Sequence, residues 1–557
     1  MPMRSRPTTS IALVASLALV AACGGGNPEP RTPAPPTPPP PTSTPPAATT
    51  APAPPAPPPD PFALRSPLRK ETLPALPTQS PEGEVWDRVE KVKVPKADAT
   101  CASYTKRSAP LAADACKDPG KARAALEKAL GEPVAKRDAA LSALEACGGL
   151  PGGLVRALRA ELAPASCGDA VVKDAKKSLG GWDPTVAHAI AGYDVAARLA
   201  RLPSAPPAFT GAASKERVLA HLKGPFGAWF AEQAKAIEEL SVIGAKLGFY
   251  GRALVAVEAG LAELRFVETM RSAPIPEAWQ KDAEIKSVYY GTLDQLLEPR
   301  KARMRDALIV GLHDMAAVGV LHDARIDRAR AGISQMYAGR RIDALDGHAL
   351  GDAPAAPPSL LGQLPTFHAG VLLTPAEAKD PKTVSALAGR GLPWTLRGGL
   401  EGAKIEDAAA RLAYARARFD LGRTYWRAVD HDAAIGLLGD KAALDDGGKL
   451  LLAAAIALRE GPDDARAMMG APSPAALNLR GTAALDAVAQ GTGEAAGRAE
   501  YDAALLALLS PPEGAGKEHF TALAERFRRA AGKLSRADEK KRAEDAAARA
   551  DATAKAL

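Results

Sequence analysis

The stretch FGAWFAEQAKAIEELSVIGAKLG, residues 226–248, carries the pattern that decides the fold class. Small and apolar side chains recur in it at steps of three and four residues, which is the spacing of one face of an α-helix. These positions are Phe230, Ala234, Ile237, Ser241, Gly244 and Gly248. Charged residues such as Glu238 and Lys246 interrupt the apolar character. We therefore expect a soluble helix, with Gly244 and Gly248 allowing a neighbouring backbone to come close.

The composition of the whole chain agrees with this helical pattern. Hydrophobic residues make up 46% of the 557 residues, but aromatic residues only 4%, so the core must consist chiefly of Ala, Leu and Val. Such cores suit closely packed helices. The short runs 89–94 and 370–374 are the only candidate strands, and neither alternates cleanly. The sequence predicts an all-α body of stacked helical hairpins arranged as a repeat-like solenoid.

A change of composition divides the body. Residues 351–365, GDAPAAPPSLLGQLP, replace helix-forming residues by proline and glycine. We interpret them as a linker between a helical domain at 65–350 and a second helical domain at 366–557. The closing stretch 534–555 mixes charged residues with alanine and is expected to form a solvated helix that frays.

The first residues have the pattern of an export signal. Arg4 and Arg6 precede an apolar run at 11–20, which is too short to cross a hydrocarbon layer of about 30 Å. The run leads into Val20-Ala21-Ala22-Cys23, which resembles the lipobox of bacterial lipoproteins.

The lipobox resemblance implies a specific processing and location. Residues 1–22 would be the lipoprotein signal peptide, and Cys23 would carry acyl chains (palmitate among them) that anchor the protein to a membrane. Gly24 stands where the family's inner-membrane retention signal has aspartate, so the resemblance favours the outer membrane if the source is a bacterium with two membranes. The alternative is an ordinary secretory cleavage after Ala22 that leaves an unmodified cysteine.

A proline-rich segment follows the expected anchor. Between residues 28 and 61, 18 of 34 residues are proline, and most of the others are Ala or Thr. Such a segment cannot bury enough apolar surface to fold, and polyproline II geometry would let it reach on the order of 100 Å. We predict that residues 23–64 form a lipidated cysteine and a disordered linker. Docking of the prolines into a partner's aromatic groove is the alternative.

Four cysteines lie within 67 residues of the first predicted domain: Cys101, Cys116, Cys147 and Cys167. None belongs to a Cys-x-x-Cys pair, which structural zinc sites usually contain, and an even number suits an oxidising compartment. We expect two disulfides. Of the three possible pairings we favour Cys101–Cys116 and Cys147–Cys167, because a helix at 154–162 would turn the chain back between the latter two. A zinc site and free thiols are the alternatives.

The second predicted domain contains ARFDLGRTYWRAVDHDAAIGLL at residues 417–438. This stretch resembles a tetratricopeptide repeat, and a similar pattern returns 31 residues later, with a looser third copy from Leu479. The tryptophan common early in the family's first helix is replaced by Arg418. The matching packing positions are Leu421, Gly422, Tyr425, Ala434 and Leu438, then Leu452, Ala453, Ile456, Ala465 and Met469.

The repeat resemblance implies stacked helical hairpins whose surface binds other proteins. Small residues such as Gly422 and Ala434 would let antiparallel helices cross closely, and larger ones would fill the space between hairpins. The alternative is a non-repetitive, alanine-rich bundle.

The sequence contains none of the common catalytic signatures, and it indicates no cofactor. The most suggestive set is His313, Asp314, His322 and Asp323, in GLHDMAAVGVLHD. On one continuous helix the two His-Asp pairs would point to opposite sides, so no metal site is expected. Residues 300–305 hold four cations, which we interpret as a solvated helix face. Anionic lipid or cell-wall polymer is the alternative partner for them.

These observations predict a membrane-anchored envelope lipoprotein that acts as a helical scaffold for protein–protein interaction and is not an enzyme. Its partners would be the membrane, through the lipid, and a protein of unknown identity. The formal net charge of +7 is small for this length and does not indicate nucleic-acid binding. The alternatives are a cell-wall glycan-processing enzyme on a helical superhelix, for which nothing selects a carboxylate pair, and a purely structural surface lipoprotein.

Overall fold

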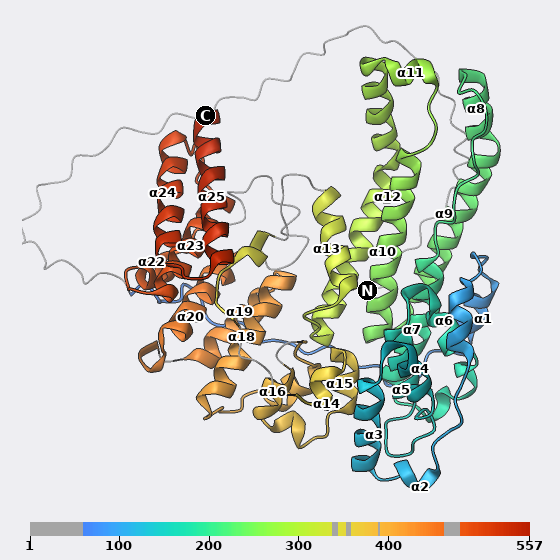
Figure 1. The fold of residues 1–557 in the computed structure, drawn as a ribbon, viewed down its shortest axis with the longest axis horizontal. Helices are drawn as coiled ribbons and strands as arrows, with labels where there is room; N and C mark the ends of the chain where they lie inside the picture. Colours follow the sequence, from blue (N-terminus) through green and yellow to red (C-terminus); the bar gives the residue numbers. More distant parts are fainter. Residues whose placement is uncertain (1–59, 337–343, 353–357, 388–389, 440, 462–478) are drawn as a thin grey trace, which may run out of the picture. The chain divides into compact units, whose positions relative to one another are not determined.

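The computed structural model describes residues 60–336, 344–352, 358–387, 390–439, 441–461 and 479–557. Residues 61–557 group into one compact unit (Figure 1). Every regular element in the described ranges is a helix, and β-pairing there is limited to a single bridge between Val320 and Gly391. The all-helical prediction is confirmed. Within the described residues, no helix is both long and apolar enough to cross a membrane.

Several predicted features lie outside the described residues. They are the signal peptide at 1–22, Cys23, the linker up to residue 59, and residues 353–357 of the expected boundary. The division of the body into two domains stays a prediction. Contacts between its expected halves do occur, since Arg123 Nη1 lies 2.7 Å from Glu377 Oε1.

The first part of the body contains thirteen α-helices in the described ranges, and α7, α10 and α12 form its centre. Their bounds are α1 Gly83–Lys91, α2 Ala113–Cys116, α3 Pro119–Gly131, α4 Val134–Ser142, α5 Leu154–Leu162, α6 Gly168–Val172, α7 Pro184–Ala200, α8 Lys215–Lys223, α9 Pro225–Gly244, α10 Phe249–Arg271, α11 Glu277–Lys281, α12 Ala283–Val318 and α13 Ala324–Met336.

The second part begins with short helices and continues with longer ones that pack in chain order. The bounds are α14 Leu360–Gln363, α15 Thr366–Leu372, α16 Lys382–Leu387, α17 Trp394–Gly399, α18 Ala408–Tyr425, α19 Ala428–Leu438, α20 Asp446–Arg459, α22 Ala483–Ala489, α23 Glu494–Leu509, α24 Lys517–Lys533 and α25 Ala537–Ala556. The two runs considered as strands are partly helical instead, since Val89 lies in α1 and residues 370–372 in α15.

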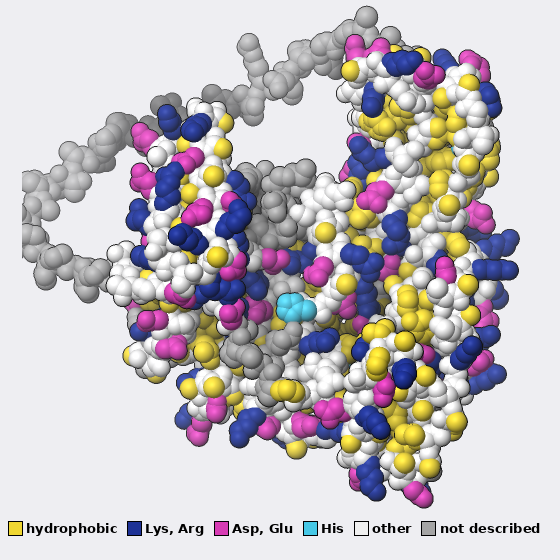
Figure 2. All heavy atoms as spheres, viewed as in Figure 1, with side chains coloured by type: hydrophobic (Ala, Val, Ile, Leu, Met, Phe, Trp, Pro, Cys, Tyr) yellow, Lys and Arg dark blue, Asp and Glu magenta, His cyan; other side chains and the backbone are white. Residues whose placement is uncertain are grey.

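The last helix buries one face. Its alanines at 543, 546, 547, 550 and 554 are buried against α24, which replaces the expected solvated, fraying helix by a packed hairpin. The outer surface of this hairpin carries intermixed basic and acidic side chains (Figure 2). The charged residues in this stretch therefore indicate only the exposed face of α25, and its alanines form the buried face.

Helices α7 and α10 cross at two glycines. A Cβ atom on Gly192 would lie 2.7 Å from the Cα of Gly251, and one on Gly251 would collide with the backbone oxygen of His188. Gly244, at the end of α9, likewise faces Val255 of α10 with no room for a side chain. The close approach predicted at Gly244 is thus to a side chain, and the backbone-to-backbone crossing lies at Gly192 and Gly251.

We expect Gly251→Ala to lower the free energy of unfolding by about 1–3 kcal/mol, because the added methyl group must push α7 and α10 apart. Gly291→Ala is the matched control, since nothing lies within 4 Å of a Cβ at Gly291 in α12. There, alanine favours the helix by up to about 1 kcal/mol. Urea unfolding of both variants measures the difference. Equal midpoints would contradict the close crossing.

Candidate functional site

The repeat-like positions of α18 and α19 lie at the interface of these two helices and in the core around it. Tyr425 is buried and donates a hydrogen bond from its hydroxyl to the backbone oxygen of Val320, at 2.7 Å. Gly422 faces His431 of α19, and a Cβ on Gly422 would lie 2.6 Å from the His431 ring. Leu421, Ala434 and Leu438 are also buried, as are Leu452 and Ala453 of α20, whereas Ile456 is half-buried.

Two positions of the second repeat, Ala465 and Met469, lie outside the described residues. In the looser third copy, Leu479 and Ala484 are buried, and α22 packs on α23. Arg418, which stands in place of the family's tryptophan, is buried as well, with its side chain 3% exposed. A buried guanidinium needs counter-charges, and these come from elsewhere in the chain.

An extended segment, residues 66–80, lies along these helices and is called the strap below. It follows the proline-rich region directly and contains no regular secondary structure. Its first residues contact α19 and α20, Glu71 contacts α17 and α18, and Gln79 contacts α7. The strap therefore connects the repeat-like helices with the helices around α7.

The first anchor point of the strap is an arginine–aspartate pair. Asp432 of α19 and Arg459 of α20 have fully buried side chains, with Arg459 Nε 2.5 Å from Asp432 Oδ1. Arg459 also donates to the backbone oxygens of Ser66, at 3.3 Å, and Pro67, at 3.0 Å. The backbone N–H of Arg69 donates to Asp432 Oδ2 at 2.8 Å. Side chains of α19 and α20 thus hydrogen-bond the backbone groups of the extended strap, as the backbone of a neighbouring strand would in a sheet.

The second anchor point is the carboxylate of Glu71. Its Oε2 lies 2.6 Å from Arg418 Nη1, and its Oε1 contacts Arg397 Nη1 and lies 3.2 Å from Arg427 Nη2. Burial alone would raise the pKa of Glu71, but the three guanidinium groups outweigh it and lower the pKa to about 2. Asp430 supplies the second counter-charge, 2.9 Å from Arg418 and 3.0 Å from Arg427.

The far end of the strap is held by a neutral histidine. The N–H of Gly248 donates to His188 Nδ1 at 3.0 Å, so the protonated Nε2 donates to the backbone oxygen of Gln79 at 3.1 Å. Burial lowers the pKa of His188, which keeps the ring neutral for this bridge. The strap also packs closely on Gly248, where a Cβ atom would lie 2.8 Å from Pro77.

The surface of α17–α20 that the strap covers binds an extended segment through two kinds of contact. Arg459 and Asp432 bind backbone groups, and Asp432 also pairs with the Arg69 side chain at 3.2 Å. The three arginines around Glu71 select a carboxylate. In this chain the bound segment is its own strap.

The disulfides differ from the expected pairing. The bonds are Cys101–Cys167, with Cα atoms 5.1 Å apart, and Cys116–Cys147, at 5.2 Å. The predicted Cys101–Cys116 and Cys147–Cys167 pairs are wrong. The helix at 154–162 exists as α5, but the chain around it returns to the 3-10 turn at Ala99–Thr105 instead of to Cys147.

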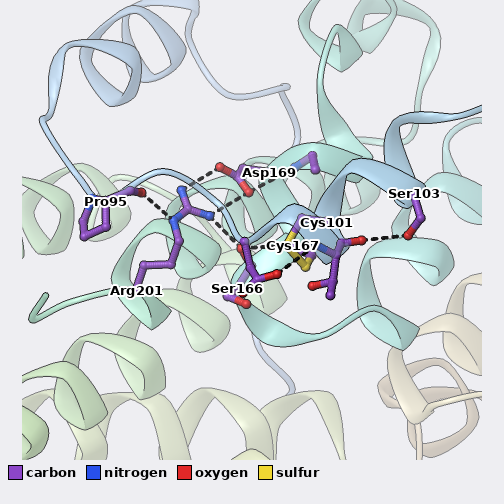
Figure 3. Close-up of a disulfide and its surroundings, with 10 residues drawn as sticks. Pro95, Cys101, Ser103, Ser166, Cys167, Asp169 and Arg201 are labelled. Atoms are coloured by element: carbon purple, nitrogen blue, oxygen red, sulfur yellow. Dashed lines mark hydrogen bonds and ion pairs between the residues drawn. A yellow bond between two sulfur atoms is a disulfide. The ribbon is translucent and has the colours of Figure 1, made fainter. Parts of the chain in front are cut away.

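Arg201 fixes the surroundings of the first disulfide (Figure 3). From the end of α7 it donates to the backbone oxygens of Pro95, at 3.0 Å, and Ser166, at 2.6 Å. Its Nη2 also lies 2.7 Å from Asp169 Oδ2. The segments that bear the two cysteines are therefore held by one guanidinium as well as by the sulfur bridge.

The histidine–aspartate set is divided by a helix end. α12 stops at Val318, and Gly319 adopts φ +91°, so the assumption of one continuous helix is wrong. His313 is exposed and Asp314 pairs with Arg252 of α10 at 2.6 Å, whereas Asp323 accepts from the Arg325 N–H at the start of α13.

The basic run at 300–305 is largely paired. Arg300 and Arg303 contact Glu263 at 2.9 and 3.2 Å, and Lys301 contacts Asp294 at 3.1 Å.

The strap was missed by sequence reasoning. Glu71 lies in an extended stretch without helical or strand period, and its three arginine partners are 326, 347 and 356 residues away in the sequence. One signal in the sequence could have indicated a buried anion near α18. Arg418 stands at a core position of the repeat, and a buried cation there requires an anionic partner.

Comparison with protein-family models, with curated proteins and with solved structures found no match to this chain.

Proposed function

We propose that this protein is a lipid-anchored envelope protein, attached through Cys23 to the outer membrane, whose helical body is a scaffold for a protein partner and not an enzyme. The observation that carries the scaffold is the packing order of α18 to α25. Each helix described there packs on the next one, from α18 on α19 to α24 on α25 (Figure 1). Such nearest-neighbour packing is typical of a solenoid of helical hairpins and supports a continuous surface for a partner.

The strap supports the tethered mode of action. Because the linker continues into the strap, which is bound to α17–α20, the membrane anchor would be tethered directly to the repeat-like helices. A partner bound on α23–α25 would then be held at a distance from the lipid that the linker sets, on the order of 100 Å when extended.

The experiment places a photo-crosslinking amino acid at Lys541 of α25 in the full-length chain, expressed in a bacterium with two membranes. The Lys541 side chain is 74% exposed. The matched control position is Lys235 of α9, whose side chain is 76% exposed. We expect one discrete adduct from position 541 and none from position 235. A smear of adducts of equal strength from both positions would contradict the scaffold.

The anchor is measured in the same cells. Mass spectrometry of the N-terminal peptide is expected to show acyl chains on Cys23 and cleavage before it, and Cys23→Ser is expected to release the protein from the membrane fraction. An unmodified Cys23 thiol at the mature start would refute the anchor while leaving the crosslinking result to decide the scaffold.

A further inference from the structure

A pocket of about 370 Å³ opens beside the first residues of α13, away from the strap. Its size falls within the range of pockets that hold small organic molecules. Helices α5, α7, α10 and α13 and the loops beside them form its wall, which combines charged side chains with small and apolar ones. Among these are Ala160, Ala163, Ala196, Leu254, Val320 and Pro365.

The floor of the pocket is a buried polar cluster. The hydroxyls of Tyr193 and Tyr250 both donate to Oε2 of Glu161, at 2.5 and 3.0 Å, and Arg325 contacts Oε1. Burial, reinforced by the charge of Glu161, raises the pKa of both tyrosines, so their hydroxyls stay protonated and keep donating. Tyr250 also stacks on Phe367 with ring centroids 4.4 Å apart. The floor is therefore held in one arrangement.

The mouth of the pocket has a different character. Arg328 and Arg390 line it and are exposed, and neither makes an ion pair within the described part of the chain. The only hydrogen bond described for the Arg328 side chain goes to the backbone oxygen of Ala324, at 3.3 Å. Arg325 on the floor, by contrast, contacts two carboxylates, those of Glu161 and Asp323. Glu258, the third carboxylate of the lining, pairs with Arg265 at 3.2 Å. The carboxylates of the lining therefore have arginine partners of their own, whereas Arg328 and Arg390 have no carboxylate partner within the described residues.

We propose that this pocket binds a small organic anion, with its carboxylate or phosphate oxygens at Arg328 and Arg390 and its carbon skeleton against the alanine-rich wall. Guanidinium groups offer paired N–H donors that match both kinds of oxyanion. The apolar wall favours a ligand with a carbon skeleton over a bare inorganic ion. This binding is independent of the scaffold function and of the lipid anchor.

Isothermal titration calorimetry of the residue 23–557 protein with succinate and with glycerol 3-phosphate tests the proposal. Succinamide and glycerol are the neutral counterparts. We expect one or both anions to bind and neither neutral compound to do so, and the anion that binds identifies the oxygen group. Arg328→Gln with Arg390→Gln should weaken binding at least 10-fold. Lys404→Gln, which removes a cation whose side chain is 89% exposed and lies outside the pocket, should leave binding unchanged.

A second readout does not depend on variant folding. Phenylglyoxal modifies accessible arginines, and peptide mass spectrometry locates the adducts. The bound anion should slow modification of Arg328 and Arg390, while modification of the exposed Arg217, which lies outside the pocket, continues at the same rate. Failure of both anions to bind, equal binding of the neutral compounds, or equal affinity of the double variant would overturn the proposal.

Discussion

Replacing Glu71 by glutamine is expected to lower the free energy of unfolding by about 3–5 kcal/mol, the cost of removing one partner from a buried ion pair. The substitution keeps the shape of the side chain and removes its charge. Arg397 and Arg418, whose side chains are 1% and 3% exposed, would then face each other and Arg427 with Asp430 as the remaining counter-charge. Chemical unfolding of the wild type and the variant measures the effect.

Glu84→Gln is the matched control. Glu84 lies on α1 with a 60% exposed side chain, and its contacts with Arg88 and Lys246 are 3.7 and 3.9 Å long. Exposed pairs of this kind contribute at most about 1 kcal/mol. If both glutamine variants lost the same small amount, the strap would not be docked through Glu71.

The Glu71 effect should depend on pH. The folded pKa of about 2 lies below the ordinary value of 4.5, so the unfolded chain binds the proton more readily. The stabilisation is therefore complete above about pH 5 and is lost as the pH falls from 4.5 toward 2. The difference between wild type and Glu71→Gln is expected to shrink over this range. A difference that stayed constant down to pH 3 would show that charge is not its cause.

The helical class could be predicted because its signal is local. The steps between Phe230, Ala234 and Ile237 follow from the turn of a single helix, and α9 has buried Ala234 and Ile237 as the pattern indicates. The end of α12 was not predicted because a glycine is an ambiguous local signal. Glycine at 319 is compatible with a helix as well as with the left-handed conformation that it adopts, and the sequence does not choose between them.

The strap and the disulfide pairing could not be predicted because both depend on contacts between distant segments. Glu71 and Arg418 are brought together only once α17, α18 and α19 have packed. The expected pairing relied on the helix at 154–162 turning the chain back from Cys147 to Cys167. That helix forms as α5, but the bonds are Cys101–Cys167 and Cys116–Cys147. The packing of α6 on α7, fixed by Arg201, decides otherwise.

Removing the Cys101–Cys167 disulfide by substituting alanine at both positions is expected to cost about 4 kcal/mol. The bond closes a loop of 66 residues, and the chain-entropy estimate for such a loop gives this magnitude. The Cys116–Cys147 bond closes 31 residues inside that loop and should be worth slightly less. Unfolding of the wild type with and without reductant measures the combined contribution of the two bonds. Reduction should bring the wild type to the stability of the variant that lacks all four cysteines. A peptide linking Cys101 to Cys116 in the unreduced digest would refute the pairing.

The folded structure itself should survive the loss of the outer bond. Arg201 still joins Pro95, Ser166 and Asp169 when the sulfur atoms are gone, so the two segments remain side by side. The loss of stability then comes from the unfolded chain, whose conformational entropy rises when the loop opens. Near-UV circular dichroism of the Cys101→Ala, Cys167→Ala variant should match the wild type below its unfolding transition. The triple variant that also carries Arg201→Gln should lose more stability than the sum of the losses from the disulfide variant and from Arg201→Gln alone. When only one of the two links is removed, the other still holds the two segments together.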